Sequence, residues 1–134
     1  MNQEEKNSLI RAAVKARENA YCPYSKYAVG AAVLTDTGEV VTGCNVENAS
    51  YGLTNCAERT AIFAAVSRGT RKIRAIAISG AGSPPYPCGA CRQVMTEFAE
   101  SPDMPVYVVM VSEEEKTEEF KLKELLPHGF MLEI

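Results

Sequence analysis

Two short cysteine motifs constrain the fold of this chain more than any other feature. The first contains Cys56 and Glu58 in a Cys-x-Glu pattern, and the second contains Cys88 and Cys91 in a Pro-Cys-x-x-Cys pattern. Together the motifs supply three thiol groups and one carboxylate, a set that can hold a metal ion and carry a proton beside it. If one ion binds all three sulfurs, the fold has to bring two distant segments of the chain to one point.

Both motifs fall where the sequence predicts that a helix begins. Thr54 and Asn55 are good N-cap residues for a helix starting near Cys56, and Pro87 suits the first position of a second helix. The unpaired N–H groups of a first helical turn carry partial positive charge, which lowers cysteine pKa values and favours thiolates. We therefore expect the N-termini of two helices to converge on the metal.

Zinc suits three thiolate ligands, and three protein ligands leave a fourth position open for water. Glu58, in the first turn, can reach that position and is the candidate catalytic acid–base. Three thiolates give a divalent ion an excess of negative charge, which something has to offset. Arg59 lies one turn after Cys56 and could donate to a thiolate, and Gln93 could do so more weakly.

Three other interpretations of the cysteines stay open at this point. A structural zinc site would need a fourth ligand from Cys22, Cys44 or His128, and none of these has a paired spacing. The Pro-Cys-x-x-Cys pair could instead be a redox dithiol, but that leaves Cys56 and Glu58 unexplained. A zinc or dithiol binding module without enzymatic activity is the third alternative.

The composition indicates an ordinary globular protein, with one domain expected over residues 1–134. A net charge of −3 without a basic stripe argues against nucleic acid as a partner. No apolar run is long enough for a membrane span, and the polar N-terminus lacks a signal-peptide pattern. We therefore expect a cytoplasmic protein, in which the five cysteines stay reduced.

Periodicity and turn residues predict alternating strands and helices, which is typical of the α/β class with helices on the faces of a central sheet. Ile62, Phe63 and Val66 are expected to form the apolar face of the helix that starts near Cys56. Residues 112–119 are expected to form a charged turn. The elements are expected to be helices at 4–20, 56–69, 88–99 and 123–126 and strands at 28–35, 39–43, 73–79, 105–111 and 120–122.

Several further motifs occur in a fixed order. They are Ala20-Tyr-Cys-Pro-Tyr-Ser-Lys-Tyr27, Gly43-Cys-Asn-Val-Glu-Asn-Ala49, Asn55-Cys-Ala-Glu-Arg-Thr-Ala61, Pro87-Cys-Gly-Ala-Cys-Arg-Gln-Val94, and Glu124-Leu-Leu-Pro127 followed by Phe130. On these motifs the chain resembles the small cytidine deaminases, the homotetrameric kind with three cysteine ligands. The resemblance covers most of the chain and implies a three-layer α/β/α fold with a central mixed five-stranded sheet.

The resemblance also implies hydrolysis of cytidine and deoxycytidine to uridine and deoxyuridine with release of ammonia, in pyrimidine salvage. One zinc ion per subunit would be held by Cys56, Cys88 and Cys91, and would activate water for attack on C4 of the base. Glu58 would protonate N3 and then the leaving amino group. A blasticidin-S-type or broader cytosine-nucleoside aminohydrolase is the alternative enzyme, since it shares the zinc motifs.

By motif position, Asn45 and Glu47 would bind the ribose hydroxyls, and the backbone of Ala57 would hold the pyrimidine edge. Tyr27 replaces the phenylalanine that the family usually places beside the nucleoside, so its hydroxyl is expected near the sugar. Three residues would reach the pocket of a neighbouring subunit, so that a homotetramer shares its active sites; they are Ala49, Tyr51 and Phe130.

Overall fold

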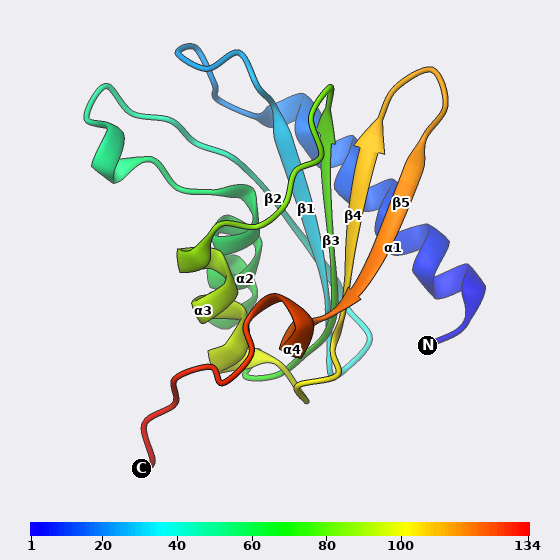
Figure 1. The fold of residues 1–134 in the computed structure, drawn as a ribbon, viewed down its shortest axis with the longest axis vertical. Coiled ribbons are helices and arrows are strands. Elements are labelled where there is room, and N and C mark those ends of the chain that lie inside the picture. The colour runs from blue at the N-terminus through cyan, green and yellow to red at the C-terminus, as the bar shows by residue number, and fades with distance from the viewer.

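The structure is a computed structural model that describes residues 1–134, and its centre is a mixed sheet of five strands (Figure 1). The strand order is β2-β1-β3-β4-β5; β3 and β4 are parallel and all other neighbours are antiparallel. This confirms the mixed five-stranded sheet. The strands are β1 (Val29–Thr35), β2 (Val40–Cys44), β3 (Ile73–Ala81), β4 (Pro105–Val111) and β5 (Lys116–Lys121).

Helices cover both faces of the sheet, which gives the three-layer α/β/α arrangement (Figure 1). Helix α1 (Gln3–Ala16) lies on one face, while α2 (Ala57–Ser67), α3 (Gly89–Phe98) and the short α4 (Leu122–Leu125) lie on the other. Two 3₁₀ turns, η1 (Arg17–Asn19) and η2 (Tyr51–Leu53), lie in the connections. No helix of this fold has the length and apolar character that a membrane crossing requires.

The alternation of side chains along the strands divides the core into two apolar layers. In β1, Ala31 and Val33 pack with α2 and α3, while Ala32 and Leu34 pack with α1. A strand that is buried on both faces reads as a nearly continuous apolar run, and β1, β3 and β4 do so apart from Thr35, Arg74 and Ser79. The sheet therefore fixes both the α1 layer and the layer that carries the cysteine motifs.

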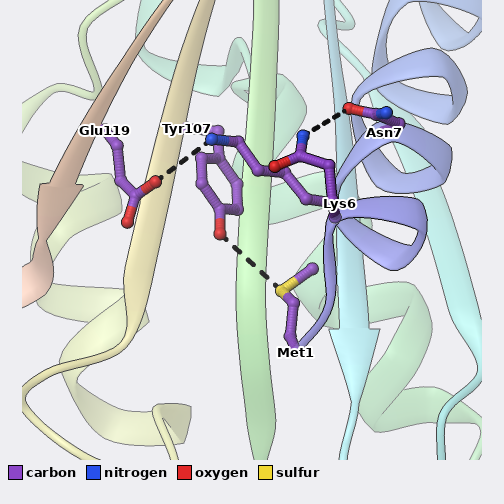
Figure 2. Close-up of polar contacts among 6 residues, drawn as sticks. Met1, Lys6, Asn7, Tyr107 and Glu119 are labelled. Carbon is purple, nitrogen blue, oxygen red and sulfur yellow. Dashed lines mark hydrogen bonds and ion pairs between the residues drawn. The ribbon is translucent and has the colours of Figure 1, made fainter.

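Helix α1 is held against β4 and β5 by a small polar group at its N-terminal end (Figure 2). Lys6 Nζ lies 5.0 Å from the centre of the Tyr107 ring and 3.3 Å from Glu119 Oε1. The Tyr107 hydroxyl is 3.7 Å from Met1 Sδ. This group lies across the sheet from the cysteine motifs, so a change at Tyr107 leaves those motifs untouched.

Two local expectations were wrong. Half of the polar segment expected as a turn is strand β5, whose register runs from Pro105–Lys121 to Met110–Lys116. An edge strand with exposed side chains has no apolar pattern to reveal it, because backbone pairing with β4 defines it. Phe63 was expected on the apolar face of α2, but its side chain is 46% exposed, while Ile62 beside it is fully buried.

Gly43 sets how closely α2 approaches β2. A Cβ placed on Gly43 would lie 2.8 Å from the Ala57 carbonyl oxygen and would also overlap the backbone nitrogen of Ala61. Both atoms belong to the backbone of α2, so the helix cannot give way by a side-chain rotation. Because α2 carries Cys56 and Glu58, this contact positions part of the candidate site.

We expect Gly43→Ala to lower the free energy of unfolding by about 1–3 kcal/mol, the usual cost of forcing extra volume into a packed contact. Unfolding in urea measures this difference. Gly52→Ala is the matched control, because a Cβ at Gly52 meets nothing within 4 Å. Equal stability of the two variants would show that α2 does not lie this close to β2.

Candidate active site

The N-termini of α2 and α3 bring three cysteines together. Cys56 is the N-cap of α2, Cys88 is the N-cap of α3, and Cys91 lies in the first turn of α3. Their three sulfur atoms lie within 4.8 Å of one another, and the Sγ atoms of Cys56 and Cys88 are 3.9 Å apart. The two motifs therefore meet at one point, although neither Thr54 nor Asn55 is the N-cap that the sequence indicated.

The local explanation for that difference is in the segment before α2. Asn55 pairs with Val46 in an isolated β-bridge, and its side-chain amide donates to Thr60 Oγ1 at 3.1 Å. The backbone of Asn55 is thus paired with Val46 and its side chain with Thr60, and Cys56 takes the N-cap without a side-chain capping bond. The Cys56 sulfur remains free to face the other two thiols.

Arg59 and the neighbouring thiol make Cys56 anionic at neutral pH. A hydrogen bond from Cys91, with a further contribution from Arg59, lowers the pKa of Cys56 to about 5 against the opposing effect of burial. The same Cys56–Cys91 bond and burial raise the pKa of Cys91. Arg59 Nη2 donates to Cys56 Sγ at 3.2 Å, and this bond to the thiolate raises the arginine pKa.

This donor set fits a zinc ion. Thiolates suit zinc, and three protein ligands are the number that a catalytic zinc site uses. Cys22, Cys44 and His128 are not part of the group, so the fourth ligand of a structural site is not supplied. Arg59 Nε is buried without a hydrogen-bond partner, which leaves a positive donor available to offset the charge of three thiolates.

Glu58 is the buried acid of the site, with only 4% of its surface exposed. Burial raises the pKa of its carboxyl to about 7, and the Cys56 thiolate acts in the same direction. A carboxyl with a pKa near 7 can both accept and release a proton under neutral conditions. Its position after Cys56 in the first turn of α2 places it on the cavity that two of the sulfurs line.

A cavity of about 190 Å³ opens beside the cysteines, between the N-termini of α2 and α3 and the segment that enters β1. A second hollow of about 350 Å³ adjoins it, and Thr54 lines both. The first is lined by Tyr27, Val29, Asn45, Thr54, Cys56, Ala57, Glu58, Pro85, Tyr86 and Cys88. The second is lined by Tyr24, Ser25, Glu47, Tyr51 and Thr54.

Asn45 lines the first cavity and is almost completely buried. Its Oδ1 accepts a hydrogen bond from the Val29 N–H at 2.9 Å, and its Nδ2 donates to the Tyr27 carbonyl at 2.8 Å. These two bonds fix both the Asn45 side chain and the backbone that leads into β1. One amide hydrogen and further acceptor capacity of Oδ1 remain for a ligand.

Glu47 lines the second hollow, and its carboxylate is already oriented by the chain. Oε1 accepts from the backbone N–H groups of Tyr24 at 3.0 Å and Ser25 at 3.1 Å, and Oε2 accepts from the Ser25 hydroxyl. The hydroxyl bond is the largest of the effects that lower the Glu47 pKa. Glu47 is therefore an ionised acceptor in the second hollow.

Other predicted site residues lie apart from the cavity beside the cysteines. Ala49 is exposed, and Tyr51, which is 74% exposed, lines only the second hollow. Phe130 is 65% exposed on the C-terminal segment and lines neither space. The hydrogen bond that the structure gives Gln93 runs from Nε2 to the Phe130 carbonyl at 2.9 Å, not to a thiolate.

Sequence reasoning missed the residues whose contribution depends on neighbours far along the chain. Thr54 was assigned to capping but lines both hollows, and Ser25 orients Glu47. Pro85 is a buried part of the cavity wall, although its segment was read only as a loop. Its place among three prolines directly before Cys88 was the one signal in the sequence that this loop is held in a fixed shape.

A three-layer α/β/α fold with three convergent cysteine sulfurs and a buried acid beside them defines a zinc-dependent hydrolytic enzyme. The family model for the cytidine and deoxycytidylate deaminase zinc-binding region matches residues 3–110. The chain is 49% identical over 130 residues to a cytidine deaminase from Halalkalibacterium halodurans, covering 96% of each chain. It is 49% identical over 126 residues to a cytidine deaminase from Sporosarcina psychrophila, covering 93% of this chain and 90% of the relative.

Among solved structures, a cytidine deaminase from Burkholderia pseudomallei superimposes with a TM-score of 0.84 at 47% identity, covering 97% of this chain and all of the other. The chain therefore belongs to the cytidine and deoxycytidylate deaminase family. Together the family and the cysteine group support one zinc ion per subunit. The redox dithiol and the binding module are not favoured, because neither explains Cys56 beside a buried Glu58.

Proposed function

We propose that the protein catalyses the zinc-dependent hydrolytic deamination of cytidine and deoxycytidine. Each turnover consumes one water molecule and yields uridine or deoxyuridine and ammonia. The observation that carries the proposal is that buried Glu58 lines the same cavity as Cys56 and Cys88. This supports the proposal, because Glu58 can accept and release a proton at neutral pH. Its carboxyl would lie beside both the substrate and a metal ion held by the three sulfurs.

Within this proposal Cys56, Cys88 and Cys91 hold the zinc ion. When bound, zinc supplies the Lewis acidity that turns water into a nucleophile at neutral pH. The Glu58 carboxylate takes a proton from the attacking water and delivers it to N3 of the base. Glu58 then takes the remaining proton of that water from the hydroxyl on C4 and delivers it to the amino group, so that the C4–N bond breaks, ammonia leaves and the C4 carbonyl forms. The backbone of Ala57, which lines the cavity, holds the polar edge of the pyrimidine.

The adjoining hollow is the proposed place of the sugar. Asn45 lines the cavity beside the cysteines, and the ionised carboxylate of Glu47 lines the hollow next to it. Both side chains can accept hydrogen bonds from ribose hydroxyls, while Tyr27 packs beside the nucleoside. Because Ser25 and two backbone N–H groups orient Glu47 in advance, little ordering of this carboxylate is needed on binding.

We propose further that the enzyme works as a homotetramer with shared active sites. Phe130, Tyr51 and Ala49 are exposed in the single subunit, and Phe130 does not line its own cavity. An exposed aromatic side chain at the tail of one subunit can cover the open side of a neighbour's cavity. Within this proposal residues 1–134 act as one domain. The activity belongs to pyrimidine salvage in the cytoplasm, where the free cysteines remain reduced thiols.

Oligomer-dependent activity gives a direct prediction. On serial dilution, specific activity will fall in step with the loss of the tetramer, and Phe130→Ala will lower activity at every concentration. Sedimentation velocity and initial rates on the same samples measure both quantities. A monomer that retains full activity at high dilution would contradict shared active sites.

The proposed activity is tested by following cytidine absorbance and ammonia release with the zinc-loaded protein. Deoxycytidine, deoxycytidine monophosphate and blasticidin S serve as parallel substrates. We expect turnover of both nucleosides, with ammonia formed in a one-to-one ratio. Turnover of blasticidin S without turnover of either nucleoside would replace this proposal by the antibiotic deaminase alternative.

A further inference from the structure

The loop that connects β3 to Cys88, residues 82–87, has few means of holding its own shape. Pro84, Pro85 and Pro87 have no N–H group to donate. One backbone hydrogen bond joins two residues of the loop, from the Tyr86 N–H to the Pro84 carbonyl at 3.0 Å. Yet the loop supplies Pro85 and Tyr86 to the cavity wall and leads directly into a metal ligand.

Tyr27, which also lines the cavity, holds the first half of this loop. Its hydroxyl donates to the Ser83 carbonyl at 2.6 Å. Gly80 makes room for this phenol, because a Cβ at Gly80 would overlap the Tyr27 hydroxyl and lie 3.0 Å from Pro85 Cβ. In the structure this hydroxyl is bonded to the loop while Tyr27 also lines the cavity, and its proximity to the sugar stays a prediction.

Two more side-chain bonds hold the second half of the loop. The Tyr86 hydroxyl donates to the Glu118 carboxylate on β5, and the Tyr86 ring lies edge-on to Phe120 with ring centres 6.0 Å apart. Arg92 Nε on α3 donates to the Pro87 carbonyl at 2.8 Å. The loop is thus fixed at three places by bonds to three different parts of the fold.

We propose that Tyr27 and Tyr86 are positioning residues whose hydroxyl groups hold loop 82–87 as the wall of the substrate cavity. This inference rests on the proposed deaminase function for its kinetic consequence. Cys56 and Glu58 belong to α2, which the loop bonds do not touch. A loosened loop therefore changes the fit of the nucleoside against Pro85 and Tyr86 more than it changes proton transfer.

The kinetic test compares Tyr27→Phe, Tyr86→Phe and the double variant with wild type, all loaded with equal zinc. Each single change removes one hydroxyl and keeps the ring. We expect KM for cytidine to rise about fivefold in each single variant, the factor given by a hydrogen bond of about 1 kcal/mol. We expect kcat to stay within about twofold, because a loss confined to binding raises KM alone.

Tyr107→Phe is the matched control, because it also removes one hydroxyl from a tyrosine, here a residue of β4. Tyr107 lies under α1, on the face away from the cavity (Figure 2). Its KM and kcat are expected to equal those of wild type. A fall in kcat without a change in KM for Tyr27→Phe would overturn the proposal, since the hydroxyl would then act in the chemical step.

Hydrogen–deuterium exchange provides a readout that does not depend on catalysis. The peptide that covers residues 82–90 will exchange faster in Tyr27→Phe than in wild type, and at the wild-type rate in Tyr107→Phe. Unchanged exchange, or faster exchange with an unchanged KM, would overturn the positioning role. If wild type fails to deaminate cytidine, the proposed function fails, while exchange in this peptide still decides whether the hydroxyl holds the loop.

Discussion

Glu58→Gln will fold and bind zinc but will lose cytidine turnover by a factor of about 10² to 10⁴, the range that a positioned acid–base group contributes. Glutamine has nearly the same shape and fits the same buried position at the start of α2. It cannot, however, accept a proton from water and return it to the substrate. The loss should therefore appear in kcat, while the zinc content and the urea unfolding curve stay close to those of wild type.

Glu97→Gln is the control for this experiment. It makes the same chemical change on an exposed position of α3, away from the cavity. Initial rates from the cytidine absorbance, zinc content by atomic emission and unfolding curves are measured on all three proteins. A Glu58→Gln variant with wild-type kcat would show that another group carries the protons, and the assignment of Glu58 would fall.

The parts of the fold that could be predicted are those encoded by local pattern. The apolar runs of β3 and β4 and the helical periodicity after Cys56 and Cys88 carry their own signal. Metal chemistry added one long-range constraint, because three thiolates can share an ion only if two helix starts meet. That constraint was enough to join segments that are far apart in the chain.

The parts that could not be predicted depend on partners that no local pattern names. Strand β5 is defined by its pairing with β4, since all of its side chains except Phe120 are polar and exposed. Nothing in the sequence connects the Tyr27 hydroxyl to the Ser83 carbonyl, to which it donates in the structure. Likewise, the Phe130 carbonyl accepts a hydrogen bond from Gln93, a residue that motif reasoning had assigned to the thiolates.

Cys56→Ala will lose stoichiometric zinc, and with it more than about 100-fold in turnover, because changes to groups that merely support metal ligands already cost about 10- to 100-fold. Only two sulfurs remain in the variant, and Arg59 loses the thiolate to which it donates. The fold should survive, since Cys56 caps α2 without a side-chain hydrogen bond. Loss of activity is then attributable to the metal and not to unfolding.

Cys22→Ala is the control, because Cys22 is a free cysteine outside the metal group. It should keep one zinc ion per subunit, and a chelator should inactivate wild type until zinc is restored. Full activity of Cys56→Ala would favour the redox dithiol interpretation instead. So would an active wild type that contains no metal and forms a reversible Cys88–Cys91 disulfide. The zinc measurement therefore separates the two chemistries that these cysteines could perform, because only a shared metal ion makes Cys56 as necessary as the Pro-Cys-x-x-Cys pair.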